Sequence, residues 1–345
     1  MGLNIREIVS RKDVDFSDLK GKTVAIDAFN TLYQFLSTIR QGDGSPLMDD
    51  NSEITSHLSG ILYRNVALLS EGIKLIYVFD GEPPELKSKI HAKRKESRDI
   101  AREKYEAAVK SENVEDMKKY SQVLTRLNDD MIKESKELLE AMGICVIQAP
   151  SEGEAQAAYL SRQEGVYASV SQDYDSLVFG APILIRNLTL SRKKKTFSGF
   201  VEVRPEMIVL DDLLSELGID QDQLICIAIL VGTDYNPKGV FRIGQKKALQ
   251  LVKEFVTPEE IFSAVEDKIY MMDKEDRFDW KEIFALFKAP KVIDPEIEFP
   301  KIDVDKIKEI LVKRHGFNEE RIDRQIEKLG IVKKAGQQKD LNKWF

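Results

Sequence analysis

Two pairs of carboxylates within residues 151–175 have the type and spacing of metal ligands. Glu152 and Glu154 follow one short apolar run, and their own stretch continues into good helix formers. Asp173 and Asp175 follow a second apolar run that predicts a strand. In an open α/β sheet, ligands gather outside the carboxyl ends of the strands. At about 4 Å and an effective dielectric constant near 20, two like charges repel by roughly 4 kcal/mol, so such a cluster needs protons or cations. Oxygen-only ligands favour Mg²⁺ or Mn²⁺.

Each pair also has a structural alternative. Ser151 followed by Glu154 has the S-x-x-E pattern of a helix capping box. Asp173 or Asp175 could instead cap a helix that begins at Ser176. Taken alone, the two pairs do not decide between metal binding and capping.

Three further carboxylates follow elements that the pattern predicts. The apolar strands at 22–27 and 74–80 each end on an aspartate, Asp27 and Asp80, and a helical stretch lies between them. Such a strand–helix–strand unit predicts neighbouring parallel strands, with both aspartates on one edge of the sheet. Asp234 follows an apolar helix predicted at 221–231. Seven carboxylates at element ends favour a metal site over unrelated helix caps.

Composition indicates a soluble globular protein with local basic segments. The net charge of −7 over 345 residues does not indicate nucleic-acid binding, so any DNA site must be a local patch. Residues 86–126 carry 12 Lys or Arg against 7 Asp or Glu. This segment is either a solvated charged helix or a basic element that attracts a polyanion. The two cysteines lie in apolar runs, and no run reaches the length of a membrane span. We therefore expect an intracellular protein with reduced, buried thiols and no membrane association.

Three other stretches carry possible binding chemistry. Residues 239–248 join a glycine turn to a helix that bears two lysines, which suits the grip of a phosphate backbone but also a plain helix–helix turn. The basic segment 192–195 is predicted at the tip of a hairpin. Trp344 and Phe345 lie at the end of a polar tail, and we expect their aromatic side chains to bind in a pocket of another protein.

Taken together, these residues resemble the flap endonuclease family of structure-specific 5′ nucleases. The resemblance covers essentially the whole chain. The blocks that carry it are MGLNIREIV, VAIDAFNTLYQFL, TSHLSGILYR, YVFDGEPPELK, AKR, PSEGEAQAAYL, SQDYDSLVFG, VGTDYN and IGQKKAL.

The resemblance implies an architecture and a set of site residues. The fold would be α/β, a mostly parallel central sheet flanked by helices, in a nuclease domain over 1–331. That domain would include a helical arch at 81–131 and a helix–three-turn–helix at 221–260, and a flexible tail would follow at 332–345. The metal ligands would be Asp27, Asp80, Glu152, Glu154, Asp173, Asp175 and Asp234. Lys87 and Arg94 would be the basic catalytic residues, acting beside Asp175. DNA contacts would come from Gly2, Tyr33, Arg40, Arg64, Gly232, Gly244, Lys246 and Lys247, with Tyr33 stacking on a base. Gln338, Leu341, Trp344 and Phe345 match a sliding-clamp motif.

The implied activity is cleavage of 5′ flaps on branched DNA with two Mg²⁺ ions, for which Mn²⁺ would substitute. It would serve DNA replication, including Okazaki fragment processing, and repair, and it would include 5′→3′ exonuclease action. The enzyme would be a monomer that binds the sliding clamp. One alternative is a 5′→3′ exonuclease or a bubble-cutting nuclease of the same superfamily. Another is a clamp-bound DNA scaffold without catalysis, and a small-molecule phosphatase is disfavoured by the basic segments.

The turn at 239–248 departs from the family pattern at two positions. The usual turn reads like GIGPKKA, whereas this chain has Arg242 in place of the first glycine and Gln245 in place of the proline. These changes leave open whether the turn carbonyls bind a monovalent cation.

Overall fold

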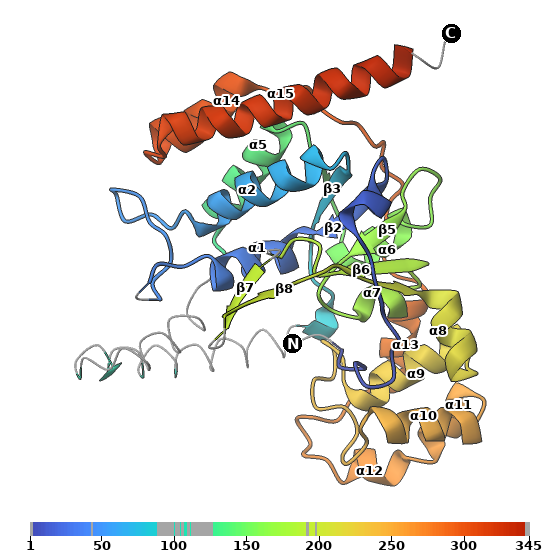
Figure 1. The fold of residues 1–345 in the computed structure, drawn as a ribbon. Helices are drawn as coiled ribbons and strands as arrows, with labels where there is room; N and C mark the ends of the chain where they lie inside the picture. The colour runs from blue at the N-terminus through green and yellow to red at the C-terminus, as the bar shows by residue number, and fades with distance from the viewer. Residues whose placement is uncertain are drawn as a thin grey trace.

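The centre of the computed structural model is a seven-stranded sheet in the order β1-β9-β6-β5-β2-β3-β4 (Figure 1). The structure describes residues 3–42, 44–87, 100, 104, 107–108, 111, 127–190, 193–196 and 199–341. The sheet strands are β1 (Lys12–Asp13), β2 (Thr23–Asp27), β3 (Lys74–Phe79), β4 (Cys145–Gln148), β5 (Ala168–Val170), β6 (Ile183–Arg186) and β9 (Glu206–Val209). Strands β4, β3, β2, β5 and β6 are parallel, while β9 and β1 pair antiparallel at one edge. The prediction of a mostly parallel α/β sheet is confirmed.

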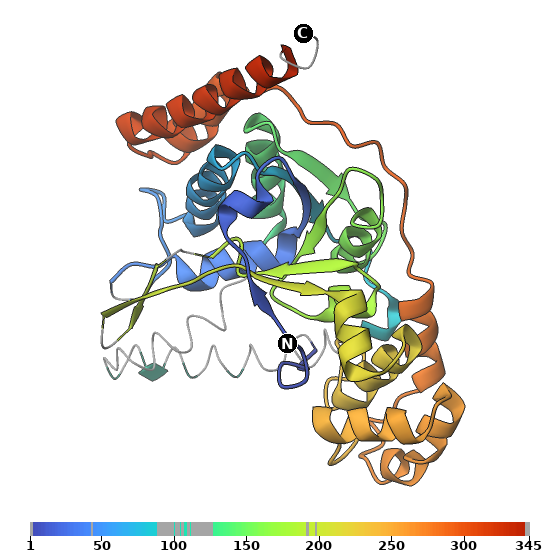
Figure 2. The same cartoon turned by 45° about the vertical axis from the view of Figure 1, so that its right-hand side comes forward.

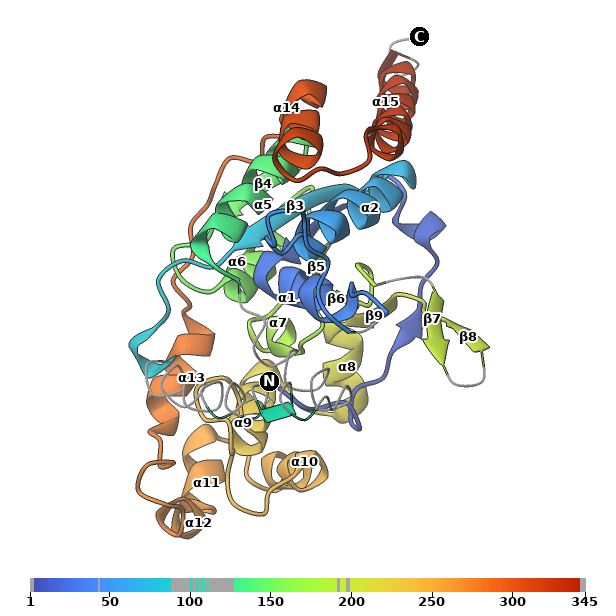
Figure 3. The same cartoon turned by 90° about the vertical axis from the view of Figure 1, so that its left-hand side faces the viewer.

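Both faces of the parallel strands are buried, which explains their continuous apolar sequences. In β2, Val24 and Ile26 pack into one core cluster, whereas Ala25 packs into another on the opposite face. Helices α1 (Ala28–Thr38), α2 (Ser56–Ser70) and α5 (Asp129–Ala141) cover the first face, and α6 (Gly153–Leu160) covers the second. Figure 3 shows these layers from the side.

A group of helices forms a second body of core beside the sheet. Its members are α7 (Asp175–Val178), α8 (Leu210–Leu217), α9 (Gln221–Val231), α10 (Gln245–Glu254), α11 (Pro258–Ser263), α12 (Glu266–Tyr270) and α13 (Trp280–Lys288). Helix α9 is buried along most of its length, and apolar residues of α7, α8, α10, α11 and α13 pack in the same cluster. The α9–α10 pair is the region in which the sequence predicted a helix–three-turn–helix.

The C-terminal helices return to the first face of the sheet. Residues 289–303 run without helix or strand along the side of the molecule, as Figure 2 shows. They lead to α14 (Val304–Lys308), the π-helix η3 (Glu309–Arg314) and α15 (Glu319–Leu341). Helix α15 lies against α2, and α14 lies against α5. The sequence placed a tail from residue 332 onward, but the structure continues α15 to Leu341.

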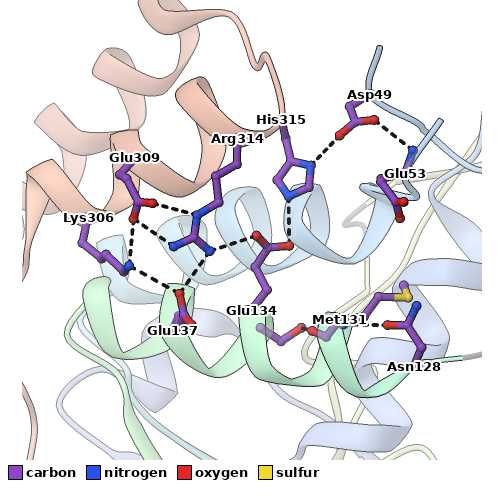
Figure 4. A network of polar contacts seen from close by, with 11 residues as sticks. Asp49, Glu53, Asn128, Met131, Glu134, Glu137, Lys306, Glu309, Arg314 and His315 are labelled. Carbon is purple, nitrogen blue, oxygen red and sulfur yellow. Dashed lines mark hydrogen bonds and ion pairs between the residues drawn. The ribbon is translucent and has the colours of Figure 1, made fainter. Parts of the chain in front are cut away.

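A polar network holds η3 to the first layer of helices (Figure 4). Arg314 donates two hydrogen bonds to Glu309 at 2.8 and 3.0 Å and one each to Glu134 and Glu137 at 3.3 and 3.1 Å. The His315 ring lies between two carboxylates, with Nδ1 2.7 Å from Asp49 and Nε2 2.9 Å from Glu134. Arg314 therefore links the C-terminal unit to α5, and His315 links it also to the loop after α1.

The remaining described elements are a short β-hairpin, which the sequence predicted, and two 3₁₀ helices. Strands β7 (Lys193–Thr196) and β8 (Gly199–Glu202) form the predicted hairpin, but the three lysines of the basic segment, 193–195, lie in its first strand and not at its tip. Two 3₁₀ helices, η1 (Phe16–Leu19) and η2 (Glu85–Lys87), precede β2 and follow β3, respectively.

Most of the predicted arch, including Arg94, lies outside the described residues. No helix in the described part of the chain is long and apolar enough to cross a membrane.

Replacing Arg314 with Leu should loosen the docking of the C-terminal unit. The change removes the guanidinium that Glu309, Glu134 and Glu137 share and leaves Lys306 and His315 as their partners. We expect it to lower the free energy of unfolding by about 1 kcal/mol, because the network is partly open to solvent. Urea denaturation measures the effect, and Lys313→Leu on the neighbouring exposed position is the matched control. Equal stability of the two variants would show that the network contributes nothing to docking.

Candidate active site

Four neighbouring parallel strands deliver six carboxylates to one edge of the sheet. Asp27 ends β2, and Asp80 follows β3 directly. Glu152 and Glu154 lie where the chain leaves β4 and begins α6, and Asp173 and Asp175 lie between β5 and α7. Because the four strands are parallel neighbours, their carboxyl ends meet, as the sequence predicted.

Three of these side chains form the tightest group. One carboxylate oxygen from each of Glu154, Asp173 and Asp175 lies within 4.8 Å of the others. This spacing suits a shared divalent cation with oxygen ligands. The side chains are also partly or fully buried, so their charges are poorly screened by solvent.

Asp27 and Asp80 are held by backbone donors at helix starts. Asp27 Oδ1 accepts a hydrogen bond from Asn30 N–H at 3.0 Å and caps α1. Asp80 Oδ1 accepts one from Gly153 N–H at 2.7 Å, so the residue directly after β3 caps the first turn of α6. A Cβ at Gly153 would lie 2.5 Å from that oxygen, which explains the glycine. The two aspartates therefore act in the site and as caps at once.

The local capping alternatives for the two pairs are wrong. Ser151 Oγ donates to the carbonyl of Glu82, and Glu154 turns into the cluster, so no capping box forms. Neither Asp173 nor Asp175 makes a capping hydrogen bond to α7. Contacts between distant parts of the chain override the local pattern in both cases.

Asn30 and Ser171 orient the inner carboxylates, and the sequence did not reveal either. Asn30 Nδ2 donates to Asp173 at 2.9 Å, while its Oδ1 accepts from the backbone N–H of Gln172 at 3.3 Å. Ser171 Oγ donates to Glu154 at 2.7 Å. One asparagine in the first turn of α1 thus joins the ends of β2 and β5. The position of Asn30, three residues after Asp27, was the only signal for it in the sequence.

Lys87 and Tyr235 hold the outer part of the site. Lys87 Nζ lies 2.5 Å from Glu152 and 3.5 Å from Asp234. The hydroxyl of Tyr235 donates to the other oxygen of Glu152, and the Lys87 ammonium lies 5.5 Å from the centre of the Tyr235 ring. The structure therefore brings the seventh carboxylate, Asp234, to the same site as the six strand-end acids.

Desolvation shifts the titration of the cluster towards the protonated forms. It raises the pKa of Asp27 and Glu154 well above their ordinary values, and neighbouring carboxylates add to the rise. It raises the pKa of Asp175 to about 7 and that of Asp80 to about 6. Desolvation alone would lower the pKa of Lys87, but Glu152 and the other acids outweigh it and raise that pKa. Ionised carboxylates are therefore disfavoured in the empty cluster, and cations bound among these oxygens would replace the protons and offset the repulsion.

The loop between α9 and α10, in which the sequence suggested a phosphate-binding turn, is compact. Gly232 has φ of +117°, and a Cβ there would lie 2.9 Å from the backbone nitrogen of Gly239. Arg242 adopts φ of +60°, a left-handed conformation that glycine adopts at lower cost. Gly244 is the N-cap of α10, and Lys246 and Lys247 are exposed in its first turn.

The other predicted site residues are placed as follows. Tyr33 is 44% exposed on α1, and Arg64 is partly buried on α2. Arg40 donates to the carbonyls of Ser37 and Gly44 and so braces its own loop. The residues Gly2, Arg94, Trp344 and Phe345 lie outside the described part of the chain, and only the backbone of Gln338 and Leu341 is described, in α15.

Comparison with known proteins places this geometry among nucleases. Residues 3–101 match the model of the XPG N-terminal domain, and residues 143–234 match that of the XPG I-region. The chain is 49% identical to flap endonuclease 1 of Thermococcus onnurineus (strain NA1), over 100% of this chain and 99% of that protein. It resembles the solved structure of flap endonuclease-1 from Methanococcus jannaschii with a TM-score of 0.73 and 39% identity, covering 96% and 98% of the two chains. The catalytic core of Rad2 in complex with a DNA substrate shares the fold, with a TM-score of 0.68 at 24% identity over 95% and 100%.

Replacing Asp175 with Asn should stabilise the protein in the absence of metal. Asp175 is 6% exposed, and its folded pKa of about 7 lies above the ordinary aspartate value of about 3.9. Its ionised form therefore destabilises the fold fully above about pH 7, progressively less towards pH 4, and not at all below that. We expect Asp175→Asn to raise the free energy of unfolding by about 1–3 kcal/mol at pH 8 and much less at pH 5.

Urea denaturation in a chelator at both pH values measures this effect. The control is Asp294→Asn, at an exposed position on the 289–303 segment. A gain of the same size at both pH values, or no gain at pH 8, would contradict the assignment of Asp175 to a repulsive cluster.

Proposed function

The chain belongs to the flap endonuclease family, a family of nucleases that hydrolyse phosphodiester bonds, and from this we propose that its seven-carboxylate site cuts 5′ flaps near their junction with duplex DNA. The observation that carries the proposal is the meeting of Asp27, Asp80, Glu152, Glu154, Asp173, Asp175 and Asp234 at one edge of the sheet.

We propose that the site uses Mg²⁺, two ions per site, with Mn²⁺ as a substitute. The donor set fits, because the side chains of the cluster offer only oxygen ligands and the Glu154, Asp173 and Asp175 oxygens converge within 4.8 Å. Bound divalent cations would supply the charge that activates a water nucleophile and stabilises the leaving oxygen. The residues that would hold them are the seven carboxylates, some directly and some through water.

Lys87 is proposed to supply positive charge to the transition state. Its ammonium group already lies inside the acidic cluster, in contact with Glu152 and Asp234, so it is close to where a scissile phosphate would bind. The raised pKa of Lys87 keeps it charged at neutral pH. Arg94, in the arch proposed at 81–131, is proposed to act beside Lys87. The two positive charges would offset the negative charge of a phosphorane-like transition state.

We propose that the duplex is gripped at the first turn of α10. The exposed Lys246 and Lys247 lie in the first turn of α10, after its N-cap residue Gly244. This position suits sequence-independent contacts to phosphates. Further DNA contacts are proposed for the residues Gly2, Tyr33, Arg40, Arg64 and Gly232. Tyr33 is the one for which exposure on α1 supports base stacking.

The wider role proposed is flap removal in DNA replication and repair, including Okazaki fragment processing, together with 5′→3′ exonuclease action. A predominantly exonucleolytic or bubble-cutting enzyme would use the same site and is the alternative that cleavage mapping decides. A clamp-bound scaffold without catalysis is disfavoured, because all seven acids are present and six are gathered at adjoining strand ends.

The C-terminal residues are proposed to bind a sliding clamp. Gln338, Leu341, Trp344 and Phe345 have the spacing of the clamp motif, in which the glutamine hydrogen-bonds at a pocket rim and the other three are buried. Burial of three such side chains contributes roughly 1.5–3 kcal/mol each, less the cost of ordering the tail. A micromolar affinity is therefore expected from this segment alone.

Cleavage mapping on a double-flap DNA tests the proposed activity. Wild-type protein with Mg²⁺ should cut within a few nucleotides of the 5′ flap junction, and Asp175→Asn should lower the rate by about 1,000-fold or more while DNA affinity stays within a few-fold. Asp294→Asn again serves as the control. Loss of DNA binding in parallel with cleavage would make Asp175 structural, and products cut singly from the 5′ end would favour the exonuclease.

Deleting residues 336–345 tests the clamp assignment. Basal flap cleavage should be unchanged, because the segment contains none of the seven carboxylates and residues 336–341 form the end of α15, while stimulation by a ring-shaped sliding clamp should disappear. The double variant Trp344→Ala, Phe345→Ala should give the same result without shortening the chain. Retained clamp binding by the deleted protein, or loss of its basal activity, would overturn the assignment.

A further inference from the structure

A short N-terminal segment joins the acidic cluster to the first turn of α10. At one end, the backbone N–H of Leu3 donates to Asp175 Oδ2 at 3.2 Å. Four residues later, the backbone N–H of Glu7 donates to the side-chain Oε1 of Gln245 at 2.8 Å. The two bonds join residues that are 172 and 238 positions apart in the sequence, so the segment connects parts of the site that lie far apart along the chain.

The segment between these bonds is well held by packing. Leu3, Ile5 and Val9 are almost fully buried, and they pack in the same core cluster as Ile243 and Ala248, which flank the start of α10. A displacement at the Gln245 end would therefore be carried along the segment towards Asp175, because a close-packed core transmits strain.

Of the two contacts that α10 makes with Glu7, the one from Gln245 is the more durable. The other is an ion pair of 3.4 Å between Lys246 and the Glu7 carboxylate, whose side chains are 78% and 60% exposed. Such an exposed pair is weak, and Lys246 is proposed above to bind a DNA phosphate instead. The Gln245 side chain faces the N-terminal segment, so it can keep its bond while the lysines hold DNA.

We propose that Gln245 is a positioning residue for the reaction: it fixes the N-terminal segment to the phosphate-binding turn and so sets the placement of Asp175 relative to bound DNA. The inference rests on the proposed function and names a residue at which this chain departs from the family's usual turn. A proline at this position would offer no side-chain acceptor for the Glu7 N–H.

Two substitutions at Gln245 separate positioning from DNA binding. Gln245→Met keeps the length and neutrality of the side chain but removes the acceptor. It should lower the single-turnover rate at saturating DNA by about 3- to 10-fold, the effect of one neutral hydrogen bond, with DNA affinity within twofold of wild type. Gln245→Glu keeps the acceptor but adds a negative charge beside the phosphates. It should weaken DNA affinity by about 5-fold or more at low salt, yet retain the wild-type single-turnover rate at saturation.

The matched control is Gln250→Met, the same change at an exposed position of the same helix. Hydrogen exchange provides a readout that does not depend on activity: the amides of residues 5–9 should exchange faster in Gln245→Met than in wild type or the control.

The outcomes distinguish this inference from the proposed function. Wild-type protein that fails to cut flap DNA with Mg²⁺ overturns the proposed function. If wild type cuts, an unchanged rate in Gln245→Met overturns the positioning role. A loss of affinity and rate together in Gln245→Met would make Gln245 a DNA ligand, and it would overturn the role equally.

Discussion

Mutual repulsion among seven carboxylates in a desolvated pocket is the constraint on which the rest of this structure depends. Each charge that the fold brings to the sheet edge is met by a donor: Asn30 for Asp173, Ser171 for Glu154, and Lys87 for the outer acids. These donors orient the oxygens but do not neutralise the cluster, since desolvation still raises the pKa of several members. Divalent cations bound among these oxygens would offset the same repulsion, which is the physical basis of the proposed metal site.

The carboxylates of the site lie at the ends of strands and helices that also form the core of the protein. Asp27 and Asp80 cap helices with the same carboxylates that they present to the cluster, so the geometry of α1 and α6 cannot change without moving oxygens of the cluster. The segment from Leu3 to Glu7 connects this cluster to the first turn of α10. The proposed metal site and the proposed DNA-binding turn therefore share one continuous framework.

The sequence predicted the strands and helices well, but it did not predict the hydrogen bonds between distant parts of the chain. Apolar runs that end on acids located β2, β3 and β5, and the buried helix α9 was predicted with its observed bounds, because burial on all sides leaves an unbroken apolar run. The role of Asn30 and the bond from Gln245 depend on partners 143 and 238 residues away, which no local pattern records. The same limit explains the false capping box at Ser151, where a tertiary contact replaced the local one.

The return of the C-terminal helices to the first face of the sheet dictates the order in which this chain can mature on the ribosome. The apolar face of α2, including Leu58 and Ile61, shares a core cluster with Ile307, Ile322 and Leu329. Synthesis delivers α2 early and its covering helices last, so the nascent protein exposes this face until nearly the whole chain has emerged. The sheet edge that carries the acids can form earlier, from residues up to α7. During vectorial synthesis, the contact between α2 and α15 therefore cannot form until after the sheet strands have all been made.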